Sequence, residues 1–326
     1  QQNYFQGRYG QLTWGDGRLF QINNFSMGGD PYPQLSMVVL DDGMTLQNPN
    51  PIPYLPVDGA VRAGNTVTGG LTGVLDNGVI NTSTSATAWP LAYYRLQPVS
   101  PAAVSFDATV NARSVTPPEV GGRLTIVGAN VLNYFTTLDM EPYRSTAPYD
   151  GSSNTPRGAD TALELTRQQD KIVAMLAALD ADVLSLMEIE AWDGAAAPQA
   201  LVTALNTYLA AHGSPDTYAA VADPSNGFFD PLAGGDYIQV ALIYKTQTVA
   251  PVGSAVSTDD PVFSRSPFAQ EFVELASGEE FVVVANHFKS KGSCPSDPTD
   301  PNADQGDGQG CWNLLREQQA AALLDF

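Results

Sequence analysis

The first part of the chain, up to residue 115, alternates short apolar runs with turn-forming residues. Asn, Asp, Gly and Pro interrupt it throughout, and no spacing of helical period persists for about ten residues. The runs that fit β-strands are Gly10–Leu12, Arg18–Ile22, Leu35–Val39, Thr66–Val74 and Tyr93–Gln97. The pattern predicts a small β-domain, a barrel or a sandwich, over residues 1–115, followed by a Gly- and Pro-containing linker at 116–122.

The pattern changes at Arg123, where strand-like apolar runs begin to alternate with segments of helical period. The predicted strands are Leu124–Val127, Val183–Met187, Val240–Tyr244, Phe272–Leu275 and Phe281–Ala285. The predicted helices are Thr161–Leu179, Pro198–Ala211 and Trp312–Leu324. Asp160 is the expected N-cap of the first helix, with an apolar stripe of Leu163, Ile172, Met175 and Leu176. Such alternation predicts an α/β domain over residues 123–326, and short turns between the late strands predict a mixed sheet.

Acidic residues outnumber basic ones by 35 to 15, which gives a formal net charge of -20. This balance argues against a protein that coats nucleic acid nonspecifically, because such proteins are basic. A polyanionic substrate would therefore need local positive charge or a bound metal. The composition fits a secreted protein of a saline habitat, or a merely soluble acidic protein. No apolar run approaches the ~18 residues of a transmembrane helix, so we expect no membrane partner.

Three predicted strands are followed by polar residues that could carry chemistry. Asn130 comes just beyond the first strand, Glu188 follows the second, and His287 follows the last. Strand ends of an α/β sheet are where sites are usually built, and a carboxylate there is a natural metal ligand. Each residue also has a plainer interpretation: Asn130 as a turn residue, Glu188 as a surface carboxylate, and His287 as a buried histidine.

Positive charge gathers beside His287 in an otherwise acidic domain. Lys289 and Lys291 are two of only four lysines in the chain, and Arg265 is an isolated cation before a predicted strand. These residues fit a site for phosphate oxygens. The alternative is that the two lysines are solvated surface residues.

The segment between Cys294 and Cys311 suggests two further features. These are the only cysteines, and their spacing within a Gly-, Asp- and Pro-rich loop favours a disulfide and an oxidising compartment over two reduced thiols. Four acidic residues lie between them: Asp297, Asp300, Asp304 and Asp307. They fit either a solvated acidic loop or a structural Ca²⁺ site.

Several stretches together resemble the secreted bacterial nucleases of ExeM/NucH type, in the endonuclease/exonuclease/phosphatase (DNase I-like) superfamily. They are Ile126–Phe135 (IVGANVLNYF), Ala181–Glu190 (ADVLSLMEIE), Val240–Lys245 (VALIYK), Asn286–Gly292 (NHFKSKG) and Gly306–Asn313 (GDGQGCWN). The resemblance implies an N-terminal OB-like β-barrel, suggested by Tyr4–Gly10 and Gly17–Gln21, followed by the first part of a four-layer αββα sandwich.

The resemblance also implies roles for individual residues. Glu188 matches the family's metal-binding glutamate, and Asn130 matches an asparagine near metal and phosphate. Arg265 matches a phosphate-contacting arginine, His287 matches the first of two site histidines, and Asp236 is expected to orient that histidine. Lys289 and Lys291 are expected to contact substrate.

The chain departs from the family pattern in places. Met187 stands where many members have Gln, and Ala191 stands where the family often has Asn. The family's later G-D-x-N and S-D-H motifs would follow Phe326. We therefore expect the catalytic domain to be incomplete at its C-terminus, with the missing C-terminal part of the same protein as a partner that supplies carboxylates and a second histidine.

The function implied is a secreted, metal-dependent nuclease that hydrolyses extracellular DNA, or RNA, by in-line attack of water with Mg²⁺ or Mn²⁺. Two alternatives remain open from the sequence. One is a phosphodiesterase or phosphatase that acts on a phospholipid or a sugar phosphate. The other is a non-catalytic secreted binding protein that depends on Ca²⁺.

Overall fold

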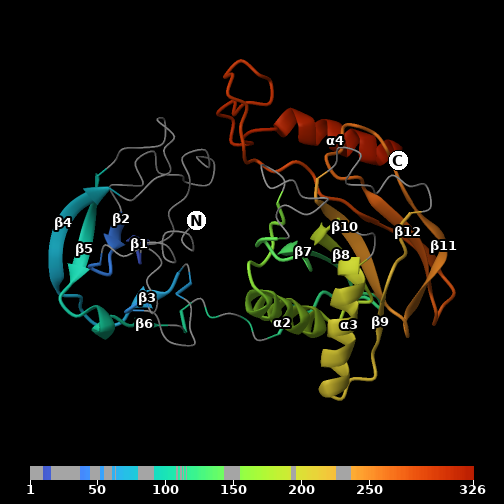
Figure 1. The fold of residues 1–326 in the computed structure, drawn as a ribbon, viewed down its shortest axis with the longest axis horizontal. Coiled ribbons are helices and arrows are strands. Elements are labelled where there is room, and N and C mark those ends of the chain that lie inside the picture. The colour runs from blue at the N-terminus through green and yellow to red at the C-terminus, as the bar shows by residue number, and fades with distance from the viewer. Residues whose placement is uncertain are drawn as a thin grey trace. The chain divides into compact units, whose positions relative to one another are not determined.

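A computed structural model of the chain describes residues 10–15, 37–44, 52–54, 61–62, 64–79, 92–107, 109–110, 112, 114, 116–142, 155–191, 196–224 and 236–326. The chain divides into two compact units, seen in Figure 1. The N-terminal unit comprises residues 1–115 with 306–308, and the C-terminal unit comprises residues 116–305 with 309–326.

The N-terminal unit contains a four-stranded sheet, with strand order β1-β2-β5-β4, and a two-stranded sheet, β3-β6 (Figure 1). A short 3-10 helix, η3 (Pro101–Ala103), precedes β6. The strands are β1 (Leu12–Gly15), β2 (Met37–Leu40), β3 (Thr66–Val67), β4 (Gly73–Val79), β5 (Ala92–Pro98) and β6 (Phe106–Asp107). The buried core of the unit consists of Leu12, Leu40, Ile52, Tyr54 and Val104.

The β-rich character predicted for this unit is confirmed, with corrections. The run Thr66–Val74 is not one strand, because it is broken at Gly69, whose φ of 73° turns the chain between β3 and β4. The predicted strand Arg18–Ile22 and most of the two OB-like motifs lie outside the described residues. Among the residues that the structure describes, the strands form open sheets and no closed barrel, so the OB-like barrel stays a prediction.

The C-terminal unit is a mixed α/β structure with two sheets. The first has the order β7-β8-β10-β9 and the second the order β11-β12-β13. The strands are β7 (Ile126–Tyr134), β8 (Val183–Glu190), β9 (Tyr218–Ala220), β10 (Ile238–Lys245), β11 (Val249–Ser257), β12 (Phe268–Glu274) and β13 (Glu280–Ala285). The helices described here are α2 (Ala162–Leu179), α3 (Ala196–Ala211) and α4 (Asn313–Asp325). Because β7 runs parallel to β8 and β10 runs antiparallel to it, the predicted mixed sheet is confirmed.

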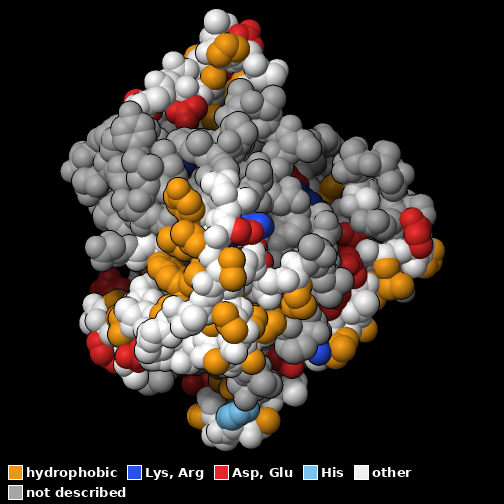
Figure 2. Space-filling model, turned by 90° about the vertical axis from the view of Figure 1, so that its left-hand side faces the viewer, with side chains coloured by type: hydrophobic (Ala, Val, Ile, Leu, Met, Phe, Trp, Pro, Cys, Tyr) orange, Lys and Arg blue, Asp and Glu red, His pale blue; other side chains and the backbone are white. Residues whose placement is uncertain are grey.

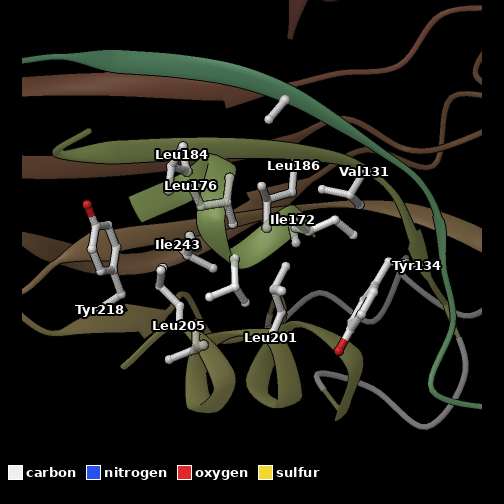
Figure 3. Close-up of a cluster of buried hydrophobic side chains, with 14 of the residues drawn as sticks. Val131, Tyr134, Ile172, Leu176, Leu184, Leu186, Leu201, Leu205, Tyr218 and Ile243 are labelled. Carbon is white, nitrogen blue, oxygen red and sulfur yellow. The ribbon is translucent and has the colours of Figure 1, made fainter. Parts of the chain in front are cut away.

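Two cores arrange these elements in layers. The larger one packs α2 and α3 against one face of the four-stranded sheet, through residues such as Leu176, Leu186 and Leu205 (Figure 3). The second joins the other face of that sheet to the three-stranded sheet, through Leu242, Phe268 and Phe272 among others. Helices, sheet and sheet thus form three consecutive layers, an arrangement compatible with the expected DNase I-like sandwich.

Local signals explain how the helices begin and which faces they bury. Helix α2 starts with a capping box, in which the Thr161 side chain accepts from Glu164 N and the Glu164 side chain accepts from Thr161 N. The N-cap is therefore Thr161, one residue after the predicted Asp160. Ile172 and Leu176 are buried as predicted, but Leu163 and Met175 are exposed.

Helix α4 differs from its sequence pattern. Its buried residue is Gln319, which accepts a hydrogen bond from Lys289 N and donates one to Val262 O, both at 2.9 Å. Its leucines Leu314 and Leu324 are exposed. This helix is thus attached within its unit by a polar contact.

The acidic composition is visible on the surface. Figure 2 shows more acidic than basic side chains on the face in view. No helix among the described residues is long and apolar enough to cross a membrane.

Candidate active site

Glu188 lies at a β-bulge in the middle of the larger sheet. Its neighbour Met187 pairs with Asn130 of β7 and Val240 of β10, and Ile189 pairs with Tyr134 and Gln239. On the β10 side, Met187 and Ile189 pair with consecutive residues, so Glu188 is an extra residue without a partner there. On the β7 side, the three residues 131–133 lie opposite Glu188. The sequence placed Asn130 and Glu188 just after the ends of two strands, whereas Asn130 lies within the longer strand β7 and Glu188 interrupts the longer strand β8.

The backbone at this bulge adopts conformations that L-residues normally avoid. Glu188 has φ 65°, and Leu132 and Asn133 opposite it have φ 55° and 51°. The left-handed region costs a residue other than Gly about 1–2 kcal/mol, with Asn the more tolerant type. Bulges and strained residues concentrate at functional sites, where a side chain has to be aimed in a direction that a regular strand does not allow.

Side chains from other elements hold the strained segment of β7. Gln168 of α2 donates through Nε2 to the carbonyls of Leu132 and Asn133, at 2.8 and 3.3 Å. Glu190, which is 1% exposed, accepts from Thr136 N at 2.7 Å and from Thr137 N at 3.2 Å. The segment is thus fixed from a helix on one side and from the next strand on the other.

The bulge presents the Glu188 carboxylate to two of the residues predicted from the sequence. Asn130 Nδ2 donates to Glu188 Oε1 at 2.7 Å, and Asn133 N donates to Oε2 at 3.2 Å. His287 Nε2 lies 3.9 Å from Glu188 Oε1, and both side chains are about one-fifth exposed, at 21% and 18%. The three residues that follow separate predicted strands therefore meet in one place.

His287 combines a buried ring nitrogen with a depressed pKa. Its Nδ1 is buried and has no hydrogen-bond partner among the described residues. Burial lowers the pKa of the imidazole, Arg265 lowers it further, and Glu188 and Asp236 oppose the shift. The ring is thus favoured in its neutral form, which carries one N–H donor and one acceptor nitrogen.

Asp236 and Arg265 are close to His287 but act differently from the sequence-based expectation. Asp236 was expected to orient the imidazole, yet Asp236 Oδ2 accepts from Arg265 Nη1 at 3.0 Å. Arg265 in turn donates through Nε to the carbonyl of His287 at 3.2 Å and through Nη2 to that of Phe288 at 2.9 Å. Asp236 therefore holds the backbone of the histidine through Arg265.

This arrangement also bears on the predicted phosphate contact of Arg265. The side chain is only 9% exposed, and all three of its nitrogens donate hydrogen bonds within the protein. Arg157 binds the other oxygen of Asp236 and is 42% exposed. Of the two arginines, Arg157 is the one whose guanidinium is more accessible to a ligand.

The lysines expected to contact substrate belong to the following loop. Lys289 Nζ lies over the ring of Trp312, 4.9 Å from its centroid, and Lys291 is exposed. Among the described residues, neither lysine forms an ion pair with a carboxylate. The predicted bond between Cys294 and Cys311 is present, and it closes this loop in front of α4.

The acidic residues of the loop do not converge on a cation site. Asp297 accepts from Thr299, and Asp300 accepts from Asn302 N, both within local turns. Nowhere in the described part of the chain do three or more His, Cys, Asp or Glu side chains gather as metal ligands would. The structure therefore gives no support to a Ca²⁺ site formed by Asp297, Asp300, Asp304 and Asp307.

Glu188 fits a hard divalent cation as a single protein ligand. Mg²⁺ usually keeps several waters and binds one or two carboxylates together with substrate phosphates. The ring nitrogen of His287 that faces this carboxylate is Nε2, 3.9 Å from Glu188 Oε1, so a second polar atom lies beside the place that a cation would occupy. Asn130, predicted as a second ligand, turns its Nδ2 to Glu188 while its Oδ1 accepts from Leu132 N at 2.8 Å, so here it orients the carboxylate.

No protein-family model matches the chain, and no curated protein matches it. Among solved structures it is weakly similar to the human Nocturnin catalytic domain with bound sulfate anion, with a TM-score of 0.27 and 17% identity over 48% of this chain. The match covers 52% of that structure, so the chain spans about half of its length. A similarity of this size assigns neither a family nor an activity.

Proposed function

We propose that the C-terminal unit hydrolyses phosphodiester bonds in nucleic acid, as part of a secreted nuclease that depends on Mg²⁺ or Mn²⁺. The observation that carries this proposal is the strained bulge that holds Glu188 against Asn130 and within 3.9 Å of His287. A fold tolerates a left-handed glutamate at a cost of about 1–2 kcal/mol when the placement of its carboxylate is needed for function.

The residues of the site divide into binding and positioning roles. Glu188 would hold the cation, which when bound neutralises charge on the phosphoryl oxygens. His287 would contact a non-bridging phosphate oxygen, because its imidazole faces the carboxylate and remains one-fifth exposed. Asn130 fixes the carboxylate, and Asp236 with Arg265 fixes the histidine backbone.

The disulfide supports the extracellular part of the proposal, and the net charge sets a condition on the binding of nucleic acid. The disulfide between Cys294 and Cys311 is of a kind that persists in oxidising compartments. A net charge of -20 repels polyanions, so productive binding would need the cation and the local positive charge of Arg157, Lys289 and Lys291.

A plasmid-nicking assay tests the proposal. The intact protein should nick supercoiled DNA with Mg²⁺ or Mn²⁺ and lose that activity with EDTA. The Glu188→Gln variant, which keeps the side-chain shape and removes the charge, should lose it as well. The Glu279→Gln variant is the matched control, because it makes the same change at the exposed turn before β13. Equal activity of the Glu188→Gln variant and the wild type would contradict the proposal.

A further inference from the structure

Helix α4 is attached to its unit through polar contacts, and these contacts lead to the segment that carries His287. The buried residue of α4 is Gln319, which is 1% exposed. A helix of a globular protein typically packs through an apolar stripe, whereas α4 leaves Leu314 and Leu324 exposed. Burial of an amide is costly unless it is hydrogen-bonded. The partners of Gln319 therefore show which part of the protein the helix holds.

The segment after β13 has no regular secondary structure of its own. Among the described residues, no hydrogen bond between two backbone groups involves residues 287–293. Because backbone N–H and C=O groups need partners when they are removed from water, side chains supply them here. Those side chains belong to Arg265, Gln319, Arg316 and Trp312. The last three lie on α4 or at its N-cap.

Two elements hold the backbone of this segment close to His287. Arg265 Nε donates to the carbonyl of His287 at 3.2 Å. Two residues further on, Gln319 Oε1 accepts from Lys289 N at 2.9 Å. Arg316 Nη1 lies 3.4 Å from the carbonyl of Lys289 and donates to it. The backbone that carries the imidazole is therefore fixed by Arg265 on one side and by α4 on the other.

Gln319 and Arg316 are themselves anchored at a second place. Gln319 Nε2 donates to Val262 O at 2.9 Å, which orients the amide so that Oε1 is left for the segment. Arg316 Nη1 also donates to the carbonyl of Cys311 at 2.8 Å, and Cys311 is held by its disulfide. Each side chain is thus bonded at two places, which restricts the positions open to the backbone between them.

We propose that Gln319 and Arg316 are positioning residues for His287, so that α4 keeps the imidazole beside Glu188. His287 Nε2 lies 3.9 Å from Glu188 Oε1, and a displacement of about 1 Å at a reacting group can cost about 10²-fold in rate. The kinetic consequence rests on the proposed function. The placement of the imidazole is a property of the folded protein, and it can be measured without substrate.

A purely structural role of α4 is the competing explanation. The same hydrogen bonds satisfy backbone groups, and their loss would lower the free energy of unfolding in either case. If stability were their only effect, the folded fraction of a variant would keep its imidazole in place and its kcat unchanged. The two explanations therefore differ in the environment of His287 within the folded protein.

NMR of the imidazole rings in the full chain makes this distinction, because the chain has only two histidines. Gln319→Met keeps the side-chain length and removes both the donor and the acceptor. At constant pH, without metal or substrate, it should shift or broaden the ring resonances of His287. The resonances of His212, which stacks on Tyr208, should stay in place. Gln318→Met makes the same change at the exposed preceding position, and it should move neither histidine.

Kinetics of plasmid nicking supply the second readout. Gln319→Met should lower kcat on the order of tenfold with little change in KM, because the imidazole is misplaced while the substrate surface is retained. The rates are measured at a temperature at which circular dichroism shows the variant to be folded. The Gln318→Met control should keep the wild-type kcat.

A second variant covers the case in which Gln319→Met does not fold. Arg316→Met removes the donor to the Lys289 carbonyl and should change the His287 resonances and kcat in the same direction. Arg167→Met is its control, because it makes the same change at an exposed position of α2.

The proposal is overturned if the His287 resonances stay in place in the folded variants, or if they move while kcat is unchanged. The proposed function fails separately: if the wild type does not nick DNA while the His287 resonances respond as expected, the positioning role stands and the nuclease assignment does not.

Discussion

At the strained bulge, the variant with glycine in place of Glu188 should be more stable than the variant with alanine, which reverses the usual order of stability within a strand. Glu188→Ala and Glu188→Gly both remove the carboxylate and its hydrogen bonds with Asn130 and Asn133, so these losses cancel between the two variants. Alanine still has to adopt φ 65°, at about 1–2 kcal/mol, whereas glycine adopts it freely. Glycine loses about 0.5–1 kcal/mol more chain entropy on folding. The Glu188→Gly variant should thus be more stable by roughly 0.5–1 kcal/mol.

Urea unfolding followed by circular dichroism measures this difference for the C-terminal unit, provided that the slope of the transition is the same in both variants. Ser185 supplies the control, because it lies on the same strand without a positive φ. There Ser185→Gly should be less stable than Ser185→Ala by about 0.5–1 kcal/mol. If alanine is the more stable substitution at both positions, the left-handed conformation of Glu188 and the argument built on it are wrong.

Three further predictions follow from contacts around the site. Gln168→Leu should lower the free energy of unfolding by about 1–2 kcal/mol and lower activity, because it removes the donor to the Leu132 and Asn133 carbonyls. The control Arg167→Leu, at the exposed neighbouring position, should change neither quantity. Equal activity in the two variants would refute a positioning role. Arg265→Lys should lower kcat on the order of 10²-fold with a smaller change in KM, because lysine cannot hold both carbonyls and Asp236; a change confined to KM would instead indicate phosphate binding. Replacing both Cys294 and Cys311 with Ser should lower the free energy of unfolding by about 3 kcal/mol. Thiol titration of the unreduced, denatured wild-type protein should find no free thiol, whereas two titratable thiols would exclude the bond.

The positions of the predicted helices of the C-terminal unit were predictable from apolar periodicity, although Leu163 and Met175 of the predicted α2 stripe are exposed. The helices 161–179 and 198–211 differ from α2 and α3 by at most two residues at an end. The short strand β9 and the edge strand β11 were missed, because β9 has three residues and β11 includes Pro251 and Gly253. The cap of α2 was misplaced by one residue, because Asp160 and Thr161 are both suitable caps and only the reciprocal bond to Glu164 decides between them.

The candidate site was predictable in its members and not in its geometry. Asn130, Glu188 and His287 were found because each follows an apolar run, and the sheet brings them together. The bulge was not predictable, since a left-handed glutamate contradicts local preference. The β7 segment opposite it is held by Gln168 of α2 and Glu190 of β8, which are distant from it in the sequence. The path from Asp236 through Arg265 to the backbone of His287 joins positions far apart in the sequence, and no local pattern marks it.

The nicking of supercoiled plasmid by the intact protein, with Mg²⁺ and with EDTA, decides whether Glu188 and His287 form a metal-dependent hydrolytic centre. Cleavage should require the metal, be lost in Glu188→Gln, and fall on the order of 10²-fold or more in His287→Ala. Cleavage that persists in EDTA, or that is unchanged in both variants, would contradict the assignment of Glu188 and His287 as the centre of a metal-dependent nuclease.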